Sequence, residues 1–144
     1  MDKTEILQFV SKQKTAFLAS VDENGYPVIR AMLAPRKIEG DEIYFSTNTS
    51  SRKVKQFAEN PKACIYFYKR GKFRYQGVAI LGEIEIRTDQ PAKDEIWRVG
   101  DRMFYKQGVT DPDYCVLKFT CRTAQTYCNL KTETVDFRTG NFSD

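Results

Sequence analysis

Residues 43–68, IYFSTNTSSRKVKQFAENPKACIYFY, predict a strand, a polar turn, a helix and a second strand in close succession. The helix is expected over residues 52–59, because the pair Asn60-Pro61 then ends it. Its first turn holds Arg52 and Lys53, although the N-terminus of a helix already carries partial positive charge. A cation at that end costs about 0.3–1 kcal/mol, so the stretch predicts an anionic ligand at the start of the helix.

The polar turn supplies further groups that an anion could use. Residues 46–51 are all short side chains with a hydroxyl or an amide, and Ser50 or Ser51 is expected to cap the helix. Hydroxyls, unpaired backbone N–H groups and two cations around one point form a phosphate cradle. The alternative is an ordinary serine cap followed by a solvated basic turn, and these residues leave both interpretations open.

A second candidate is Arg30, which interrupts the otherwise apolar segment YPVIRAMLAP, residues 26–35. A charge on such a strand lies either on a solvated face or against a ligand. If Arg30 and Arg52 converged on one anion, both would be ligand residues, but spacing alone does not establish that convergence.

The remaining elements predict a fold rich in strands. A first helix is expected over residues 3–13, and Asn24-Gly25 and Gly40-Asp41 each predict a tight hairpin turn. A third hairpin follows over residues 62–86, where Gly77 or Gly82 predicts a bulge or sharp bend, and one or two short helices follow it. Final strands are expected at 114–121 and 124–130. Because hairpins join most strands, residues 1–144 predict one mainly β domain, an antiparallel barrel with peripheral helices.

Composition narrows the chemistry. Net charge is +4, which tolerates an anionic ligand without requiring nucleic acid. No stretch approaches the about 20 apolar residues of a membrane helix, and the first residues lack a signal-peptide core, so a cytoplasmic location is expected. Histidine is absent, which argues against haem and most zinc sites. The four cysteines lack CxxC spacing and are expected to be free thiols, and no metal is expected.

The segment KRGKFRYQ, residues 69–76, allows a function of a different class. Basic residues alternate there with Phe73 and Tyr75, as in barrels that bind single-stranded nucleic acid. A charged hairpin tip with aromatic strand positions is the simpler explanation of the Lys69–Tyr75 pattern, so nucleic-acid binding is kept only as an alternative.

Three segments together resemble the pyridoxamine phosphate oxidase superfamily of flavin-binding split barrels, in particular its general stress protein branch. They are ASVDENGYPVIRAM, the stretch at 43–68 quoted above, and GVTDPDYCVLKF. The resemblance implies a six-stranded antiparallel Greek-key split barrel that forms a homodimer with FMN at the subunit interface. It also implies the cofactor residues, which are Arg30, Ala31, Met32, Leu33, Ser46, Thr47, Ser51, Arg52, Lys53, Gln76 and Tyr127.

The chain departs from the vitamin-synthesising oxidase of this superfamily. That enzyme has an Arg-x-His motif near its end, where this chain reads NLKTETVDF, so oxidation of vitamin B6 is not expected. Haem-binding relatives need a histidine that this chain lacks. The resemblance implies a flavin-dependent oxidoreductase or reductase of unknown substrate, with no assigned acid or base. A protein that stores or senses flavin is the alternative, and a deazaflavin could replace FMN.

Overall fold

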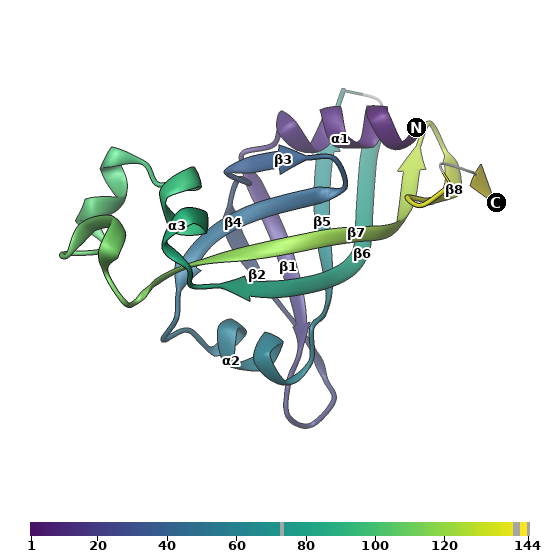
Figure 1. Ribbon diagram of the computed structural model, residues 1–144. Coiled ribbons are helices and arrows are strands. Elements are labelled where there is room, and N and C mark those ends of the chain that lie inside the picture. Colours follow the sequence, from purple (N-terminus) through teal and green to yellow (C-terminus); the bar gives the residue numbers. More distant parts are fainter. Residues whose placement is uncertain (73, 140–141, 144) are drawn as a thin grey trace.

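The computed structural model describes residues 1–72, 74–139 and 142–143, which form one antiparallel sheet with peripheral helices (Figure 1). The helices are α1 Lys3–Ser11, α2 Arg52–Glu59, α3 Gln90–Ile96, η1 Val99–Met103 and η2 Gly108–Thr110. The strands are β1 Thr15–Val21, β2 Pro27–Leu33, β3 Lys37–Glu39, β4 Glu42–Asn48, β5 Lys62–Arg70, β6 Tyr75–Arg87, β7 Tyr114–Cys128, β8 Lys131–Asp136 and β9 Phe142–Ser143. None of the described helices is long and apolar enough to cross a membrane.

The sheet has the strand order β2-β1-β5-β6-β7-β4-β3, with β8 and β9 added beyond β7. The mainly β split-barrel prediction is confirmed, but the described residues form nine strands instead of six, because short strands lengthen the sheet. The two final strands expected at 114–121 and 124–130 are one continuous strand, β7. Of the two glycines expected to mark a bulge, Gly82 does so, because the pairing of β6 with β7 shifts at Leu81/Gly82. The strands continue on both sides of this bulge.

Gly82 has a steric reason to be glycine. A Cβ at this position would lie 2.0 Å from the carbonyl oxygen of Thr120 on β7, a distance that no side chain tolerates. The close approach of the two backbones at the bulge therefore depends on the missing side chain.

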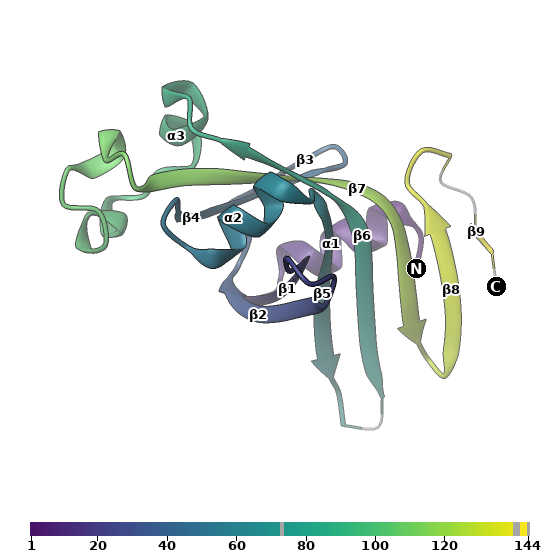
Figure 2. The same ribbon diagram turned by 90° about the horizontal axis from the view of Figure 1, so that it is seen from below.

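Two helices lie at opposite ends of the barrel (Figures 1 and 2). The first, α1, is capped by Asp2 and Glu5 in a capping box and buries Ile6, Phe9 and Val10 in the core. The second, α2, buries Val54 and Phe57 in the same core. Because only these apolar positions of α2 face inward, the polar side of the helix remains at the surface.

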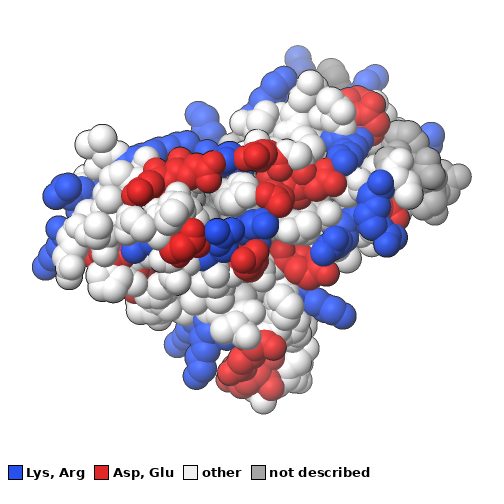
Figure 3. Space-filling view, in the orientation of Figure 1, with Lys and Arg blue, Asp and Glu red and all other residues white. Residues whose placement is uncertain are grey.

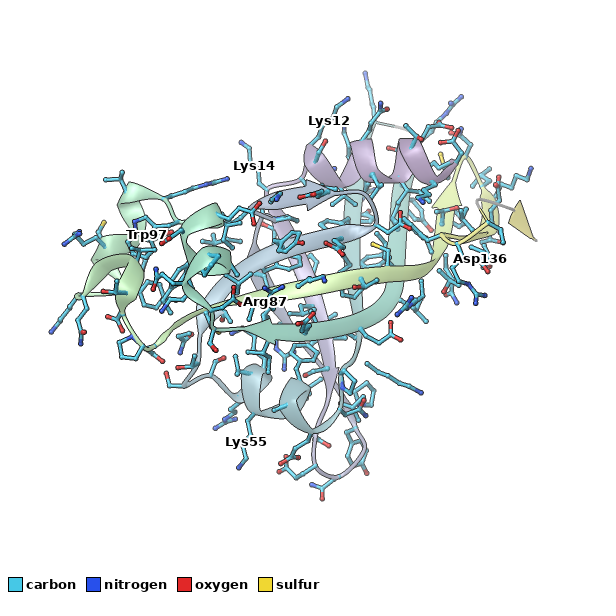
Figure 4. All side chains as sticks on the ribbon, viewed as in Figure 1. Lys12, Lys14, Lys55, Arg87, Trp97 and Asp136 are labelled. Atoms are coloured by element: carbon cyan, nitrogen blue, oxygen red, sulfur yellow. The ribbon has the colours of Figure 1, made fainter. Side chains whose placement is uncertain are left out.

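A lobe formed by residues 88–113 extends from the barrel and carries α3, η1 and η2 (Figure 1). Arg36, which follows β2, fastens it by donating from both terminal nitrogens to the carboxylate of Asp101 at 2.8 and 2.7 Å. Trp97, labelled in Figure 4, packs in the lobe against Tyr105 and Tyr114, with ring centroids 6.2 and 5.0 Å away. The lobe is therefore held by one buried ion pair and one aromatic cluster.

Candidate functional site

Arg30 lies on the inner side of β2, where its register partner is the buried Leu18 of β1. Its guanidinium is held by neutral acceptors: Nη1 donates to the carbonyl oxygen of Leu18 at 3.1 Å and to Ser20 Oγ at 2.8 Å, and Nη2 donates to Gln56 Oε1 at 3.1 Å. Burial lowers the pKa of Arg30 from its ordinary value. The strand therefore holds a partly desolvated cation whose hydrogen-bond partners carry no negative charge.

Lys53, in the first turn of α2, is a second cation in the same environment. Burial lowers the pKa of its ammonium group, and the charge of Arg30 lowers it further. No ion pair within the described parts of the chain includes Arg30 or Lys53. The two like charges repel each other in the empty protein, and an anion bound near both would relieve that repulsion.

The backbone at the start of α2 also favours an anion. Ser51 occupies the N-cap position, as expected, but its side chain makes no cap hydrogen bond, and its hydroxyl donates to the carbonyl oxygen of Asn48 at 2.8 Å. The first N–H groups of the helix are therefore not satisfied by the cap side chain. Their partial positive charge adds to that of the two cations.

Asp113 fixes the loop that leads into α2. Its carboxylate accepts hydrogen bonds from Thr49 Oγ1 at 2.8 Å and from the Ser50 N–H at 2.9 Å, and its carbonyl oxygen accepts from the Thr49 N–H at 2.7 Å. The hydrogen bond from Thr49 contributes most to lowering the pKa of Asp113. Residues 49–51 thus have a defined path even though they form no regular element.

Arg52 takes a different direction from Lys53. It lines a surface groove of about 490 Å³ between α2 and the β1–β2 turn, together with Asp22, Glu23, Val28, Lys55, Gln56 and Glu59. Figure 3 shows acidic and basic atoms close together at this end of the molecule. The electrostatic neighbour of Arg30 is therefore Lys53, while Arg52 stands in a groove that also contains carboxylates.

The strand residues that the resemblance implicates divide between two faces of the sheet. On β2, Arg30 and Met32 alternate with Ala31 and Leu33, and Met32 packs against the core whereas Ala31 and Leu33 are exposed. On β4, Thr47 is buried opposite Cys115 and Ser46 is half-buried. Thr47 therefore faces the barrel interior, whereas the side chains of Ala31 and Leu33 are directed outward.

Gln76 and Tyr127 lie away from Arg30 and Lys53. The pairing of Gly77 with both Tyr68 and Tyr127 puts Tyr127 on the outer face of the sheet, whereas Arg30 is on the inner face. Gln76 lies opposite Lys69 of β5, whereas Arg30 lies opposite Leu18, whose own β5 partner is Ile65. The two positions are therefore separated by three strand pairings and, along β5, by roughly 13 Å at about 3.3 Å per residue. One chain therefore does not bring Arg30 and Tyr127 to a common ligand.

Two stacked tyrosines border the outer face near this end. Tyr75 and Tyr127 have ring centroids 4.6 Å apart at an interplanar angle of 13°, and they line a pocket with Arg74, Asn129 and Leu130. Lys69 and Arg70 are exposed nearby, while Phe73, the aromatic residue of the nucleic-acid alternative, lies outside the described residues. The described part of the Lys69–Tyr75 pattern does not distinguish a nucleic-acid surface from a charged hairpin.

The cysteines show little sign of reactivity. Burial raises the pKa of Cys115 to about 11 and that of Cys121 to about 12, and it also raises the pKa of Cys64. All four cysteines are free. Across residues 1–72, 74–139 and 142–143, no group of three or more potential ligand side chains could hold a metal ion.

Sequence reasoning missed three residues that position Arg30 or the loop before α2: Ser20, Gln56 and Asp113. Ser20 had a usable signal, because it is a polar residue at an inward position of β1, two places after the buried Leu18. Gln56 stood among ordinary polar positions of an amphipathic helix. Asp113 is distant in sequence from the loop that it fixes, so neither Gln56 nor Asp113 carried a local signal.

Comparisons with known proteins agree on one family. A family model described as pyridoxamine 5'-phosphate oxidase matches residues 2–128. A pyridoxine/pyridoxamine 5'-phosphate oxidase of Shewanella frigidimarina is 41% identical over 68 residues, or 47% of this chain and 31% of that protein. The match thus spans about a third of the curated relative's length.

Solved structures agree in fold. A protein from Clostridium acetobutylicum, related to general stress protein 26 and assigned to the pyridoxinephosphate oxidase family, is 34% identical, has a TM-score of 0.81 and is matched over 96% of each chain. A pyridoxamine 5'-phosphate oxidase-related, FMN binding protein from Nostoc punctiforme is 15% identical with a TM-score of 0.69, covering 98% of this chain and 93% of that one. At 15% identity the likeness concerns the fold alone.

Proposed function

Because the chain belongs to the pyridoxamine 5'-phosphate oxidase family, we propose that it is an FMN-binding flavoprotein, an oxidoreductase or reductase of unknown substrate. The observation that carries the proposal is the pair of Arg30 on β2 and Lys53 in the first turn of α2, two partly desolvated cations that have no carboxylate partner among the described residues. A phosphate carries about −1.5 to −2 charges at pH 7 and three acceptor oxygens, which matches two cations and free helix N–H groups.

The residues have separate tasks in this proposal. Arg30, Lys53 and the first N–H groups of α2 bind the phosphate, while Ser51 and Arg52 complete the edge of the phosphate site. The resemblance assigns the β2 segment Ala31, Met32 and Leu33 and the β4 pair Ser46 and Thr47 to the remainder of the cofactor, although their side chains divide between the two faces of the sheet. When bound, the flavin supplies the redox chemistry, and the protein positions it and excludes water.

We also propose a homodimer, because the outer face of β2, β1, β5 and β6 is apolar and open. Phe17, Ile29 and Leu33 on that face are 39%, 64% and 73% exposed. Contiguous exposed apolar surface of this kind is typical of protein interfaces. A second copy would cover it and would bring its own Gln76 and Tyr127 to a cofactor that Arg30 of the first copy holds, which one chain does not do.

A test of cofactor identity compares three ligands. We expect the purified protein to be yellow or to bind added FMN, and to bind riboflavin at least about tenfold more weakly, since riboflavin lacks the phosphate that the two cations hold. A deazaflavin serves as the third ligand in the same titration. Equal affinity for FMN and riboflavin would contradict the phosphate site. Tighter binding of the deazaflavin than of FMN would identify a deazaflavin as the cofactor.

Turnover and assembly are measured separately. Oxidation of reduced nicotinamide nucleotide in the presence of FMN distinguishes a reductase from a protein that only stores or senses flavin. Light scattering with FMN present tests the dimer, and a monomer that binds FMN at full affinity would contradict the shared site.

A further inference from the structure

Gln56 links three elements at the proposed phosphate site. Its Oε1 accepts hydrogen bonds from Arg30 Nη2 at 3.1 Å and from Ser20 Oγ at 2.5 Å, and Ser20 Oγ in turn accepts from Arg30 Nη1 at 2.8 Å. The three side chains come from α2, β1 and β2 and close a small hydrogen-bonded ring. Ser20 is 2% exposed, so the inner side of this ring is shielded from water.

An amide oxygen holds a guanidinium in place without neutralising it. A glutamate at the same position would make the same contacts through a charged oxygen and would cancel the charge of Arg30. The other acceptors of Arg30 are a backbone carbonyl and a hydroxyl, so the neutrality of Gln56 leaves the full charge available. Lys53, the second cation, then acts on the same ligand together with Arg30.

We propose that Gln56 is a specificity-determining positioning residue: it fixes Arg30 toward the cofactor phosphate and, by being uncharged, makes the site select phosphorylated over unphosphorylated flavin. This inference rests on the proposed function, because it assigns the selected group to the FMN phosphate. It goes beyond the proposed function because it attributes the preference for FMN over riboflavin to Gln56, a residue that does not itself contact the phosphate.

A purely structural role for Gln56 predicts a different outcome. If the amide only fastened α2 to β1 and β2, any replacement would loosen the whole site and weaken FMN and riboflavin binding together. If it preserves the charge of Arg30, an added negative charge must act on FMN alone. The ratio of the FMN and riboflavin affinities therefore separates the two roles.

The test uses Gln56→Glu and the matched charge change Gln8→Glu on α1, at the other end of the barrel. In Gln56→Glu we expect the FMN affinity to fall at least about tenfold, because the new carboxylate pairs with Arg30 and repels the phosphate. Riboflavin affinity should stay within about twofold, the size of effect expected from a change that leaves ring contacts intact. Gln8→Glu should leave both affinities within the same limit.

The empty protein supplies a readout that does not depend on flavin. Gln56→Glu should melt at a higher temperature than the parent protein, since it gains an ion pair with a partly buried cation, whereas Gln56→Leu should melt lower. Equal weakening of FMN and riboflavin in Gln56→Glu, or an unchanged ratio, would overturn the inference. If the parent protein itself shows no preference for FMN, the proposed function fails first and this inference fails with it.

Discussion

Two arginines on either side of the end of β2 have opposite surroundings. Arg36 donates both terminal nitrogens to Asp101, and the two side chains are 9% and 8% exposed. The Asp101 hydrogen bond raises the pKa of Arg36, and the same bond lowers the pKa of Asp101. Among the described residues Arg30 has only neutral acceptors, and burial lowers its pKa.

The difference separates a structural charge from a charge kept for a ligand. Arg36 has its counterion within the chain, so its charge is used to hold the 88–113 lobe. Arg30 is positioned equally firmly, but its charge remains uncompensated. Firm positioning without neutralisation is the arrangement expected where an external anion completes the site.

Arg36→Met should produce the largest loss of stability. The free energy of unfolding should fall by about 3–5 kcal/mol, because the substitution leaves the buried carboxylate of Asp101 without its cation. Urea denaturation measures this loss. The ratio of the FMN and riboflavin affinities should be unchanged, because the Arg36–Asp101 ion pair holds the 88–113 lobe and makes no contact with Arg30 or Lys53. A loss of phosphate selectivity would show that the two arginines do not have separate roles.

Arg30→Met, the same substitution at the other arginine, should act on binding. FMN affinity should fall by roughly ten- to a hundredfold, which corresponds to a lost charge-assisted hydrogen bond of about 1.5–3 kcal/mol. The free energy of unfolding should change by less than about 1 kcal/mol, because no charged partner is left unpaired and Gln56 keeps its bond to Ser20. A stability loss as large as that of Arg36→Met would make Arg30 a structural residue as well.

Much of the fold was predictable from the sequence. The turn glycines and the helix at 52–59 are local signals that the structure confirms, and Gly82 is the one of the two glycines expected to mark a bulge that does so. The family resemblance is also confirmed, because its motifs are local segments in a fixed order. The expectation of two strands at the end was wrong because the register of β7 shifts at Arg122, between the two expected strands, while its pairing with β6 continues on both sides.

The site was less accessible to sequence reasoning because its decisive contacts are distant in the chain. Asp101 lies 65 residues from Arg36, so the sequence did not show which arginine has a counterion. The partners of Arg30 on β1 and α2 became evident only from strand register and helix packing. The assignment of residues to a flavin site stays a prediction that the variants above test.

Arg52→Ala should have a smaller effect than Arg30→Met. Arg52 is exposed and shares its groove with Asp22, Glu23 and Glu59, so its charge is partly compensated, and we expect FMN affinity to fall by about three- to tenfold. Lys55→Ala is the control for net charge, because Lys55 lines the same groove as Arg52 but lies three residues further from the start of α2 (Figure 4). Equal FMN affinities for the two variants would show that Arg52 is an ordinary surface cation that does not bind the phosphate.

The smallest effect should appear in the pH dependence that Lys53 imposes. Its pKa in the folded protein lies below the ordinary value of 10.5, mainly because of burial. Between the folded and the unfolded pKa the unfolded chain binds more protons, so the empty protein should become more stable as pH rises through this interval. FMN affinity should change in the opposite direction, because deprotonation removes a positive charge that attracts the phosphate.

Titrations of FMN from pH 7 upward measure this decrease, and riboflavin corrects for ionisation of the ring that the two ligands share. The decrease should be a few-fold and absent in Lys53→Met, since the guanidinium of Arg30 keeps its charge over this range. An identical decrease in Lys53→Met would assign the titration to another group. If the fall in FMN affinity with rising pH is absent in Lys53→Met but present in Lys55→Ala, then the charge of Lys53, like that of Arg30, serves to bind the ligand.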